Sequence, residues 1–524
     1  MDIDIVSLSR FQFAATALYH FLFVPLTLGL SILLAIMESV YVMTGRTIWR
    51  DMTKFWGLLF GINFALGVAT GVVMEFQFGM NWSYYSHYVG DIFGAPLAIE
   101  ALMAFFLEAT FVGLFFFGWD RMSKVKHLIA TWCVAFGSNF SALWILVANG
   151  WMQNPVASTF NPQTMRMEMG DFASVVLNPV AQAKFVHTVS AGYTTAAAFV
   201  LGVSAWYLLR GRYKEIAKRS MTVAASFGLA ASLSVVVLGD ESGYLSGEHQ
   251  KMKLAAIEAM WDTEKAPASF TLFGLPDVKN RETHFAIHIP WVMGIIGTRS
   301  FDEQIPGIKD LVAQSEKEIR QGILAYDALE KIQQAKGAAV PQETIDQFEN
   351  NGRSLGYALL LKRYVDDPRT ATDEQISKAA WDLVPEVPVI FWAFRIMVAC
   401  GFALILIMAT FFYLSARHRL ENRRWLLKLA VCAIALPWIS VECGWVVAEI
   451  GRQPWIIEGI LPTAVAVSNL GVTTVFLTIC GFVALYTALL VVEVRLMLKY
   501  IRKGPDVLNE HSEVQNNASA TALS

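Results

Sequence analysis

Nine long apolar stretches are the feature that most constrains how this chain folds. They lie at roughly 12–41, 54–79, 95–118, 126–147, 184–209, 219–239, 388–413, 425–449 and 468–498. A helix needs about 20 such residues to cross a bilayer. Because unpaired backbone groups are not tolerated in hydrocarbon, uninterrupted apolar runs of this length predict helices. We therefore expect an all-α integral membrane protein with nine transmembrane helices.

The composition is typical of a protein that is embedded in a lipid bilayer. Of the 524 residues, 55% are hydrophobic and 16% are charged, whereas soluble domains carry roughly 25% charged residues. The net charge of −3 offers no basic surface for nucleic acid. The five cysteines show neither the spacing of a disulfide framework nor that of a zinc site. The first apolar run is too long for a signal peptide, so we expect the first helix to be retained.

The charges in the connecting segments predict the orientation in the membrane. Lysine and arginine cluster in alternate connections, at 43–54, 119–126, 210–219 and 416–428, whereas 80–94 has none. The positive-inside rule places the basic connections on the cytoplasmic side of the membrane. The N-terminus is then outside and the C-terminus cytoplasmic. The tail at 501–524 is polar and is expected to be disordered.

One long insertion separates the sixth and seventh predicted helices. Residues 240–386 contain 24 acids and 16 bases, which predicts an extramembrane domain on the outer face. Within it, 309–336 has apolar residues at helical spacing and predicts an amphipathic helix. The expected organisation is therefore helices 1–6 in 1–239, the insertion in 240–386, helices 7–9 in 387–500 and the tail in 501–524. No inverted repeat or broken helix is evident.

Ionisable side chains occur at depths where the membrane makes them costly, which by default marks a cofactor, an ion path or a proton relay. A single ionisable side chain in a membrane helix is about as often hydrogen-bonded within the bundle as it is part of a functional site. A set of this size favours a functional reading. The set comprises His20, Glu100, Glu108, His187, Glu442 and Glu449.

Topology groups these residues by depth. His187 and Met397 both fall in the outer half, where an imidazole and a thioether can form the axial pair of a haem b, although most Met residues serve packing. Glu100 and Glu108, with Ser141 and Asn149 on the next helix, can form a proton path from the inner side. The alternative is that short polar residues only join helices.

Several blocks, in order, resemble those of one family. They include "ALYHFLFVPLTLG", "WSYYSHYVGDIFGAPLAIE", "GSNFSALWILVANGWMQNP", "AKFVHT", "LGDESGY", "KLAAIEA", "FRIMVACG" and "GWVVAEIGRQPW". Over nearly its whole length the chain is similar to subunit I of the proteobacterial cytochrome bd quinol oxidases.

The resemblance implies three haems: low-spin haem b558, high-spin haem b595 and the chlorin haem d. By position, His187 and Met397 would ligate the low-spin iron, with Arg395 as a stabilising charge. His20 and Glu449 would ligate the high-spin pair; His20 on haem d and Glu449 on haem b595 is the favoured arrangement, and the reverse stays open. The remaining roles would be Glu100 at the oxygen site as a possible distal ligand of haem d, Glu108 and Ser141 on the proton path, Glu442 near the haem pair, Trp445 between haems and Arg452 at haem propionates.

The resemblance also implies the substrate and the partners. The insertion would be a long quinol loop, with Lys253 and Glu258 binding quinol near Asp240; the role of 280–380 stays open. The activity would be oxidation of ubiquinol or menaquinol at the periplasmic face. Reduction of O2 to water with cytoplasmic protons would then build a gradient without pumping. The partners would be subunit II and a small single-helix subunit.

Two alternatives come from other classes of protein. A proton-coupled transporter would use the buried carboxylates as ion sites, but such proteins usually show inverted repeats and broken helices. A haem-b membrane anchor would explain His187 and Met397 but not His20, Glu100 and Glu449. A visible absorption spectrum separates the three hypotheses.

Overall fold

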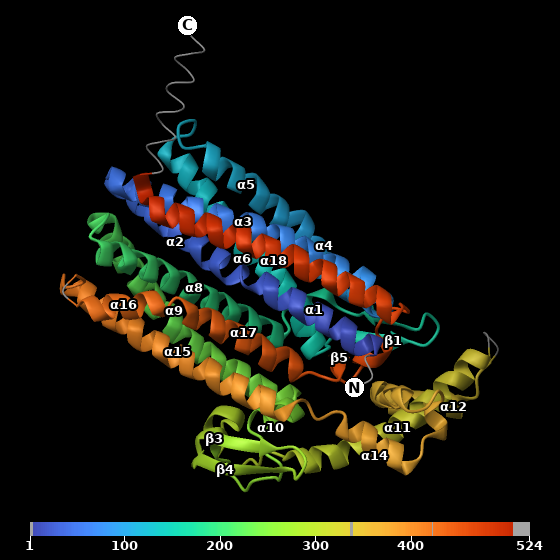
Figure 1. The fold of residues 1–524 in the computed structure, drawn as a ribbon. Coiled ribbons are helices and arrows are strands. Elements are labelled where there is room, and N and C mark those ends of the chain that lie inside the picture. The colour runs from blue at the N-terminus through green and yellow to red at the C-terminus, as the bar shows by residue number, and fades with distance from the viewer. Residues whose placement is uncertain (1–3, 336–338, 422, 507–524) are drawn as a thin grey trace.

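The computed structural model describes residues 4–335, 339–421 and 423–506. Long helices run side by side in one bundle, and a group of short helices and strands sits at one end of it (Figure 1). Among the described residues, nine helical stretches are long and apolar enough to cross a membrane. The structure therefore confirms the predicted helical fold. Residues 507–524, most of the expected tail, lie outside the described residues.

The nine spans are built from long helices, some of them in two or three pieces. In chain order they are α1 (Ile5–Phe21) with α2 (Val24–Thr44), α3 (Thr47–Met80), α4 (Ser83–Ile99) with a π-helical segment (Glu100–Phe105) and α5 (Phe106–Phe117), α6 (Lys124–Gln153), α8 (Pro179–Arg210), α9 (Lys214–His249), α15 (Val387–Ala416), α16 (Arg424–Cys432) with α17 (Ala435–Ile450), and α18 (Val472–Lys503).

The remaining helices and strands are short, except for α11 with 27 residues. They are β1 (Ser158–Asn161), β2 (Arg166–Met169), α7 (Phe172–Val176), α10 (Lys251–Ile257), β3 (Phe270–Asp277), β4 (Glu282–Ile289), a π-helical turn (Gly294–Thr298), α11 (Ile308–Gln334), α12 (Gln342–Asn351), α13 (Leu355–Leu359), α14 (Asp373–Trp381), β5 (Trp455–Ile457) and β6 (Leu461–Pro462). The strands pair as three antiparallel hairpins, β1–β2, β3–β4 and β5–β6.

The central helix of the bundle is α8. Its apolar window is 83% buried inside the protein, against 11% for the window of α18. It packs against α2, α6, α9, α16 and α17, because small residues let these helices approach closely. A Cβ added at Gly29 of α2 would lie 2.6 Å from the carbonyl oxygen of Gly192 in α8. Asn178 caps the start of α8, and Gly211 ends it with a φ of 69°.

Three spans are interrupted in the described chain, so the expectation of unbroken helices is wrong. The first breaks at Leu22 and Phe23, because Pro25 has no backbone N–H to continue the helix. The Leu22 carbonyl accepts a hydrogen bond from Trp438 Nε1 at 2.8 Å. The Phe23 carbonyl accepts one from Asn63 Nδ2 at 2.8 Å, in addition to the helical bond from the Thr27 N–H at 3.0 Å. The third span contains the π-helical segment from Glu100, and the eighth breaks between α16 and α17.

The insertion begins later than the sequence suggests, because α9 continues without a break to His249. The boundary expected at 240 therefore falls inside a helix. The predicted amphipathic helix at 309–336 is confirmed as α11, and Lys336 lies outside the described residues. Ile308, Ile319 and Leu361 of the insertion form a core that also takes in Phe391 of α15. The insertion is thus packed directly onto the end of the bundle.

Candidate functional site

His20 lies in the last turn of α1, directly before the break in the first span. Its Nδ1 is 2.8 Å from Thr70 Oγ1. That hydroxyl donates its own hydrogen to the carbonyl of Leu66 at 2.9 Å, so it accepts from Nδ1–H and leaves the lone pair on Nε2. A Cβ added at Gly71 would lie 3.2 Å from the ring. The imidazole is therefore held in one orientation with a metal-binding nitrogen available.

His187 and Met397 lie on α8 and α15, which both pack against α9. Each side chain faces a glycine. A Cβ added at Gly239 of α9 would lie 3.1 Å from His187 Cε1, and one added at Gly444 of α17 would lie 3.3 Å from Met397 Sδ. The space beside each donor is thus left free by the absence of a side chain.

Glu442 and Trp445 project from α17. Both carboxylate oxygens of Glu442 are buried without a hydrogen-bond partner among the described residues. Burial of an unpaired carboxylate is costly, so these oxygens indicate room for a group that the protein itself does not supply. The Trp445 ring packs edge-on against Phe21, with centroids 5.1 Å apart.

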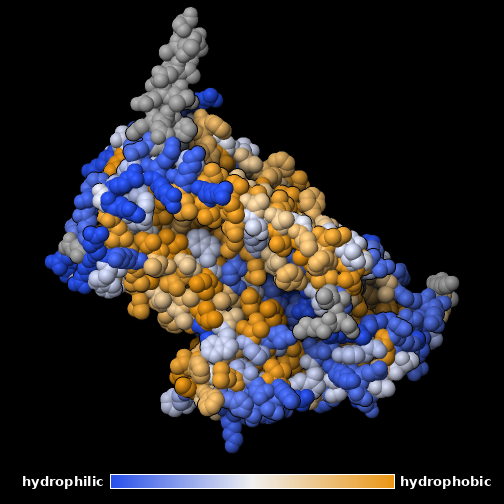
Figure 2. Space-filling view, in the orientation of Figure 1, coloured by the Kyte–Doolittle hydropathy of each residue, from blue (hydrophilic) through white to orange (hydrophobic). Residues whose placement is uncertain are grey.

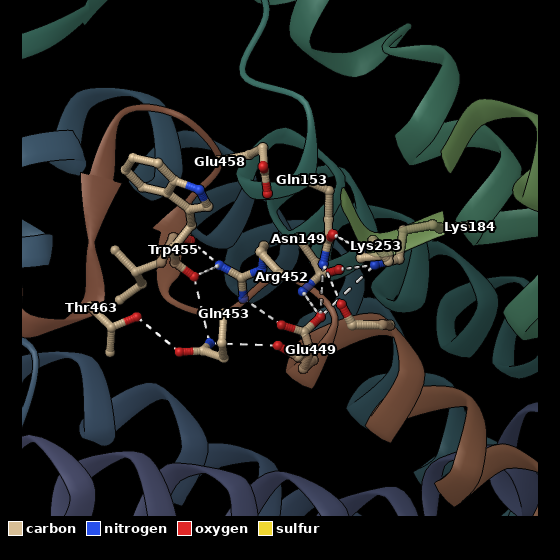
Figure 3. A network of polar contacts seen from close by, with 12 residues as sticks. Asn149, Gln153, Lys184, Lys253, Glu449, Arg452, Gln453, Trp455, Glu458 and Thr463 are labelled. Carbon is tan, nitrogen blue, oxygen red and sulfur yellow. Dashed lines mark hydrogen bonds and ion pairs between the residues drawn. The ribbon is translucent and has the colours of Figure 1, made fainter. Parts of the chain in front are cut away.

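Glu449, at the end of α17, is the centre of a polar network (Figure 3). One carboxylate oxygen accepts hydrogen bonds from Asn149 at 3.0 Å and from Gln153 at 3.2 Å. The other forms an ion pair with Arg452. Lys184 lies 3.9 Å from the carboxylate. The network neutralises a carboxylate that sequence reasoning treated as an iron ligand, and it takes up Asn149, which was expected on the proton path.

Lys253 joins this network from the insertion. Its ammonium donates to the amide oxygens of Gln153 and Gln250, both at 2.6 Å. Gln250 in turn donates to Glu458 at 3.0 Å. Burial, with the nearby charge of Lys184, lowers the pKa of Lys253 to about 7. The Lys253 ammonium, which joins the insertion to α6, therefore loses its proton more readily than an exposed lysine does.

Glu258 follows α10 and is also buried, but its partners differ from those of Lys253. Its carboxylate accepts from the backbone N–H of Thr271 at 2.9 Å and lies 3.3 Å from the Arg395 guanidinium. Arg395 also donates to the carbonyl of Ile257 at 2.8 Å. Burial raises the pKa of Glu258 to about 7, although the arginine opposes that shift. The carboxylate is thus set to exchange a proton near neutral pH.

Asp240 has a charged partner of its own. It is half exposed and pairs with Arg299, in the loop after β4, at 3.5 Å. In the described part of the chain it forms no hydrogen bond or ion pair with Lys253 or Glu258. Its place near the quinol residues stays a prediction of the family resemblance.

Glu100 and Glu108 each accept a hydrogen bond from a serine of α6. Ser141 donates to Glu100 at 2.7 Å, and Ser138 donates to Glu108. Ser141, which was expected on the proton path with Glu108, lies one turn along α6 from the serine that Glu108 contacts. Glu100 begins the π-helical segment, a type of irregularity that is frequent at functional sites.

A second buried carboxylate cluster lies on α2 and α6 and was missed by sequence reasoning. Glu38 accepts from Thr131 at 2.5 Å and lies 2.6 Å from His127 Nδ1. His127 Nε2 donates to the carbonyl of Phe115 at 3.0 Å. Glu38 stands within the apolar stretch 12–41, so the criterion that selected His20 also applies to it. Sequence reasoning likewise missed the network residues Gln153, Lys184 and Glu458, which lie at helix ends or in loops.

The donor set fits iron porphyrins. Imidazole and thioether are ligands that haem iron takes in proteins, and here they come with free space at Gly239 and Gly444. His20 presents an unprotonated nitrogen, and Glu442 has two unpaired buried oxygens. His20, His187, Met397 and Glu442 are therefore the residues whose donor atoms could hold such groups as they stand. Glu449, the other predicted iron ligand, has partners on both carboxylate oxygens.

Comparisons with known proteins agree with this donor set. The family model of cytochrome bd terminal oxidase subunit I matches residues 8–505. The chain is 52% identical over 512 residues to cytochrome bd-II ubiquinol oxidase subunit 1 of Escherichia coli strain K12, covering 98% of this chain and 99% of the relative. It is 37% identical over 509 residues to cytochrome bd ubiquinol oxidase subunit 1 of Bacillus subtilis strain 168, covering 96% and 95%.

The fold has a counterpart among solved structures. The bd oxidase from Geobacillus thermodenitrificans has a TM-score of 0.77 with 24% sequence identity, over 96% of this chain and 99% of that one. The match supports the helical arrangement independently of the sequence comparisons. The chain therefore belongs to the cytochrome bd terminal oxidase subunit I family and is a multi-pass membrane subunit of a quinol:O2 oxidoreductase.

Proposed function

We propose that this chain is the subunit of a respiratory oxidase that takes electrons from ubiquinol or menaquinol at one face of the bilayer and carries the site where O2 becomes water. The observation that carries the proposal is His20, a histidine at a helix break whose Thr70 partner leaves Nε2 free. Haem groups, when bound, supply the electron transfer and the oxygen chemistry. The chain supplies the ligands, the protons and the access routes.

His187 and Met397 hold the low-spin haem b558 in this proposal. Their position on two helices that share α9 as a neighbour supports this pairing. His20 and Glu449 serve haem d and the high-spin haem b595, with His20 assigned to haem d. Arg452 ion-pairs with Glu449, and its guanidinium would bind a haem propionate if Glu449 held the iron. Trp445 lies between these sites.

Quinol is oxidised beside Lys253 and Glu258. Each quinol hydroxyl needs an acceptor for its proton, and the Glu258 carboxylate, with a pKa of about 7, is suited to that task. Lys253 hydrogen-bonds the other oxygen of the head group. Arg395 holds Glu258 in place and lies two residues before Met397 on α15. The residue that positions the proton acceptor and the low-spin haem ligand therefore sit on the same turn of helix.

Protons for oxygen reduction come from the opposite face. Ser138 with Glu108 and Ser141 with Glu100 provide two relay points in succession along α6. The basic connections lie at the end of the bundle away from the insertion (Figure 1), which supports a cytoplasmic assignment for that end. The insertion and the N-terminus are then periplasmic. Quinol protons leave on one side and oxygen takes up protons from the other, which builds a gradient without a pump.

The complex contains further subunits in this proposal. α18 and the α4–α5 span each have apolar windows that are only 11% buried within this chain. These faces are available to subunit II, to a small single-helix subunit or to lipid. The membrane is the bacterial inner membrane.

A visible spectrum of the purified complex tests the proposal. We expect b-type bands and a far-red chlorin band, and Met397→Leu should remove the low-spin component alone. Met408→Leu is the matched control, since Met408 is a buried methionine of the same helix that packs near Gly228 of α9. A colourless, iron-free complex would contradict the proposal. Equal spectra for the two variants would contradict the Met397 assignment.

A further inference from the structure

The β3–β4 hairpin and the turn after it expose an unusually apolar surface for an extramembrane segment. Phe285 is 79% exposed and Trp291 is 62% exposed. Soluble surfaces rarely show contiguous apolar patches of this kind unless they bind something. We call this surface the hairpin face; it comprises Leu272, Phe273, Leu275, Phe285, Ile287, Ile289, Trp291 and Ile295.

The hairpin lies level with the first turns of a membrane span. The Arg395 guanidinium of α15 donates to the carbonyl of Thr271 in β3 at 3.0 Å. The ring of Phe273 packs edge-on against Trp392 of α15, with centroids 5.3 Å apart. Arg395 follows Val387, the start of α15, by eight residues, which is about 12 Å of helix. The base of the hairpin is therefore beside the first turns of a helix that is long and apolar enough to cross the bilayer.

The hairpin face continues the lipid-facing surface of the spans. Val389 and Ile396 of α15 and Val236 and Val237 of α9 are exposed apolar residues. The hairpin extends sideways from the end of α15, outside the outline of the bundle (Figure 1). The space-filling view shows hydrophobic surface at the same place, next to the spans (Figure 2). The apolar surfaces of the hairpin and of the spans thus lie on the same side of the molecule.

The charges of the hairpin are segregated at its tip. No Asp, Glu, Lys or Arg occurs in 270–276 or 285–298, whereas Asp277, Lys279, Arg281 and Glu282 occupy the turn. Arg281 lies 3.5 Å from the ring centroid of Trp381 in α14. The charged tip is therefore turned toward the rest of the insertion, and the uncharged strands are left on the side of the spans.

We infer that the hairpin face inserts into the headgroup and acyl boundary of the lipid bilayer, with the charged tip in water. Aromatic side chains are favoured at that boundary, and a face of this composition gains free energy by leaving water. Because Thr271 of β3 donates to Glu258 at 2.9 Å, insertion also fixes this carboxylate beside the lipid. Together with the proposed function, this means that a quinol head group reaches Glu258 sideways from the bilayer.

Spin-label accessibility tests the insertion independently of the quinol chemistry. The complex in phospholipid nanodiscs is labelled at Ile287→Cys on the hairpin face and at Glu282→Cys on the tip, with the unsubstituted complex as the blank for the native cysteines. Collision rates with lipid-soluble O2 and a water-soluble nickel chelate are compared. We expect the O2-to-nickel ratio to be several-fold higher at 287 than at 282.

Two results would overturn the inference. Equal, nickel-accessible labels would place the hairpin face in water, and a label at 287 that is shielded from both reagents would show that a protein subunit covers it. A second variant, Phe285→Glu, should slow oxidation of a long-chain quinol in nanodiscs while leaving a water-soluble quinol and the haem spectrum unchanged. If the label at 287 is accessible from lipid but Phe285→Glu slows both quinols equally or neither, the hairpin face still enters the bilayer and lateral entry of quinol is refuted. Lateral entry is the part of the inference that rests on the proposed function.

Discussion

Replacing Thr70 by valine should weaken haem binding at His20 without touching an iron ligand. The two side chains have nearly the same shape, and Thr70 is fully buried, so packing changes little. The substitution removes the acceptor for His20 Nδ1–H, which now lies 2.8 Å from the hydroxyl. A buried donor left unpaired costs about 1–3 kcal/mol, and loss of such an orienting partner typically lowers metal affinity by about 10–100-fold.

The assay is the haem content of the purified complex, measured from its absorption spectrum after dilution into haem-free buffer. Thr70→Val should lose the component assigned to His20 and keep the low-spin component. The matched control is Thr195→Val in α8, where the buried hydroxyl donates only to the carbonyl of Ala191 at 2.9 Å. Equal retention of all haems in the two variants would refute the argument that Thr70 holds the imidazole in its metal-binding form.

Three further predictions rest on the same geometry. Gly239→Ala places a Cβ 3.1 Å from the imidazole of His187 and should reduce the low-spin signal in a reduced-minus-oxidised spectrum. The control Gly243→Ala, whose Cβ meets nothing within 4 Å, should leave that signal unchanged. Glu258 is a base only above its pKa of about 7, so quinol kcat/KM should rise as pH rises through that value, and Glu258→Gln should abolish this dependence. Ser138→Ala removes a hydrogen bond to Glu108 and should slow proton uptake by about tenfold in proteoliposomes; an unchanged rate would exclude this serine from the path.

Hydropathy alone predicted the spans well, because a bilayer demands a long apolar helix and offers few alternatives. The same pattern could not show where those helices break. Pro25 stands within a continuous apolar run, and only the contacts from Asn63 and Trp438 show that the chain stops and restarts beside His20. The π-helical segment at Glu100 has no hydropathy signal either.

Residue type and depth selected candidate side chains, but could not show which ones meet. His20 and Glu449 were selected because their charge or polarity is costly in lipid. Their partners, Thr70 and Gln153, are ordinary polar residues whose importance depends on contacts between helices distant in the sequence. The pairing of Ser138 with Glu108 was missed for the same reason, since neighbouring serines on one helix differ only in the direction that they face.

The hydrogen-bonded chain from Glu458 through Gln250, Lys253 and Gln153 to Glu449 has a consequence for engineering. The long insertion cannot be exchanged between homologues by joining the chains at the ends of the flanking helices. A chimaera with a foreign loop would remove the Lys253 ammonium to which Gln153 is hydrogen-bonded. Gln153 itself donates to Glu449, so the loss would reach that carboxylate. Grafts should therefore keep the native segment through Glu258 and exchange only residues C-terminal to it.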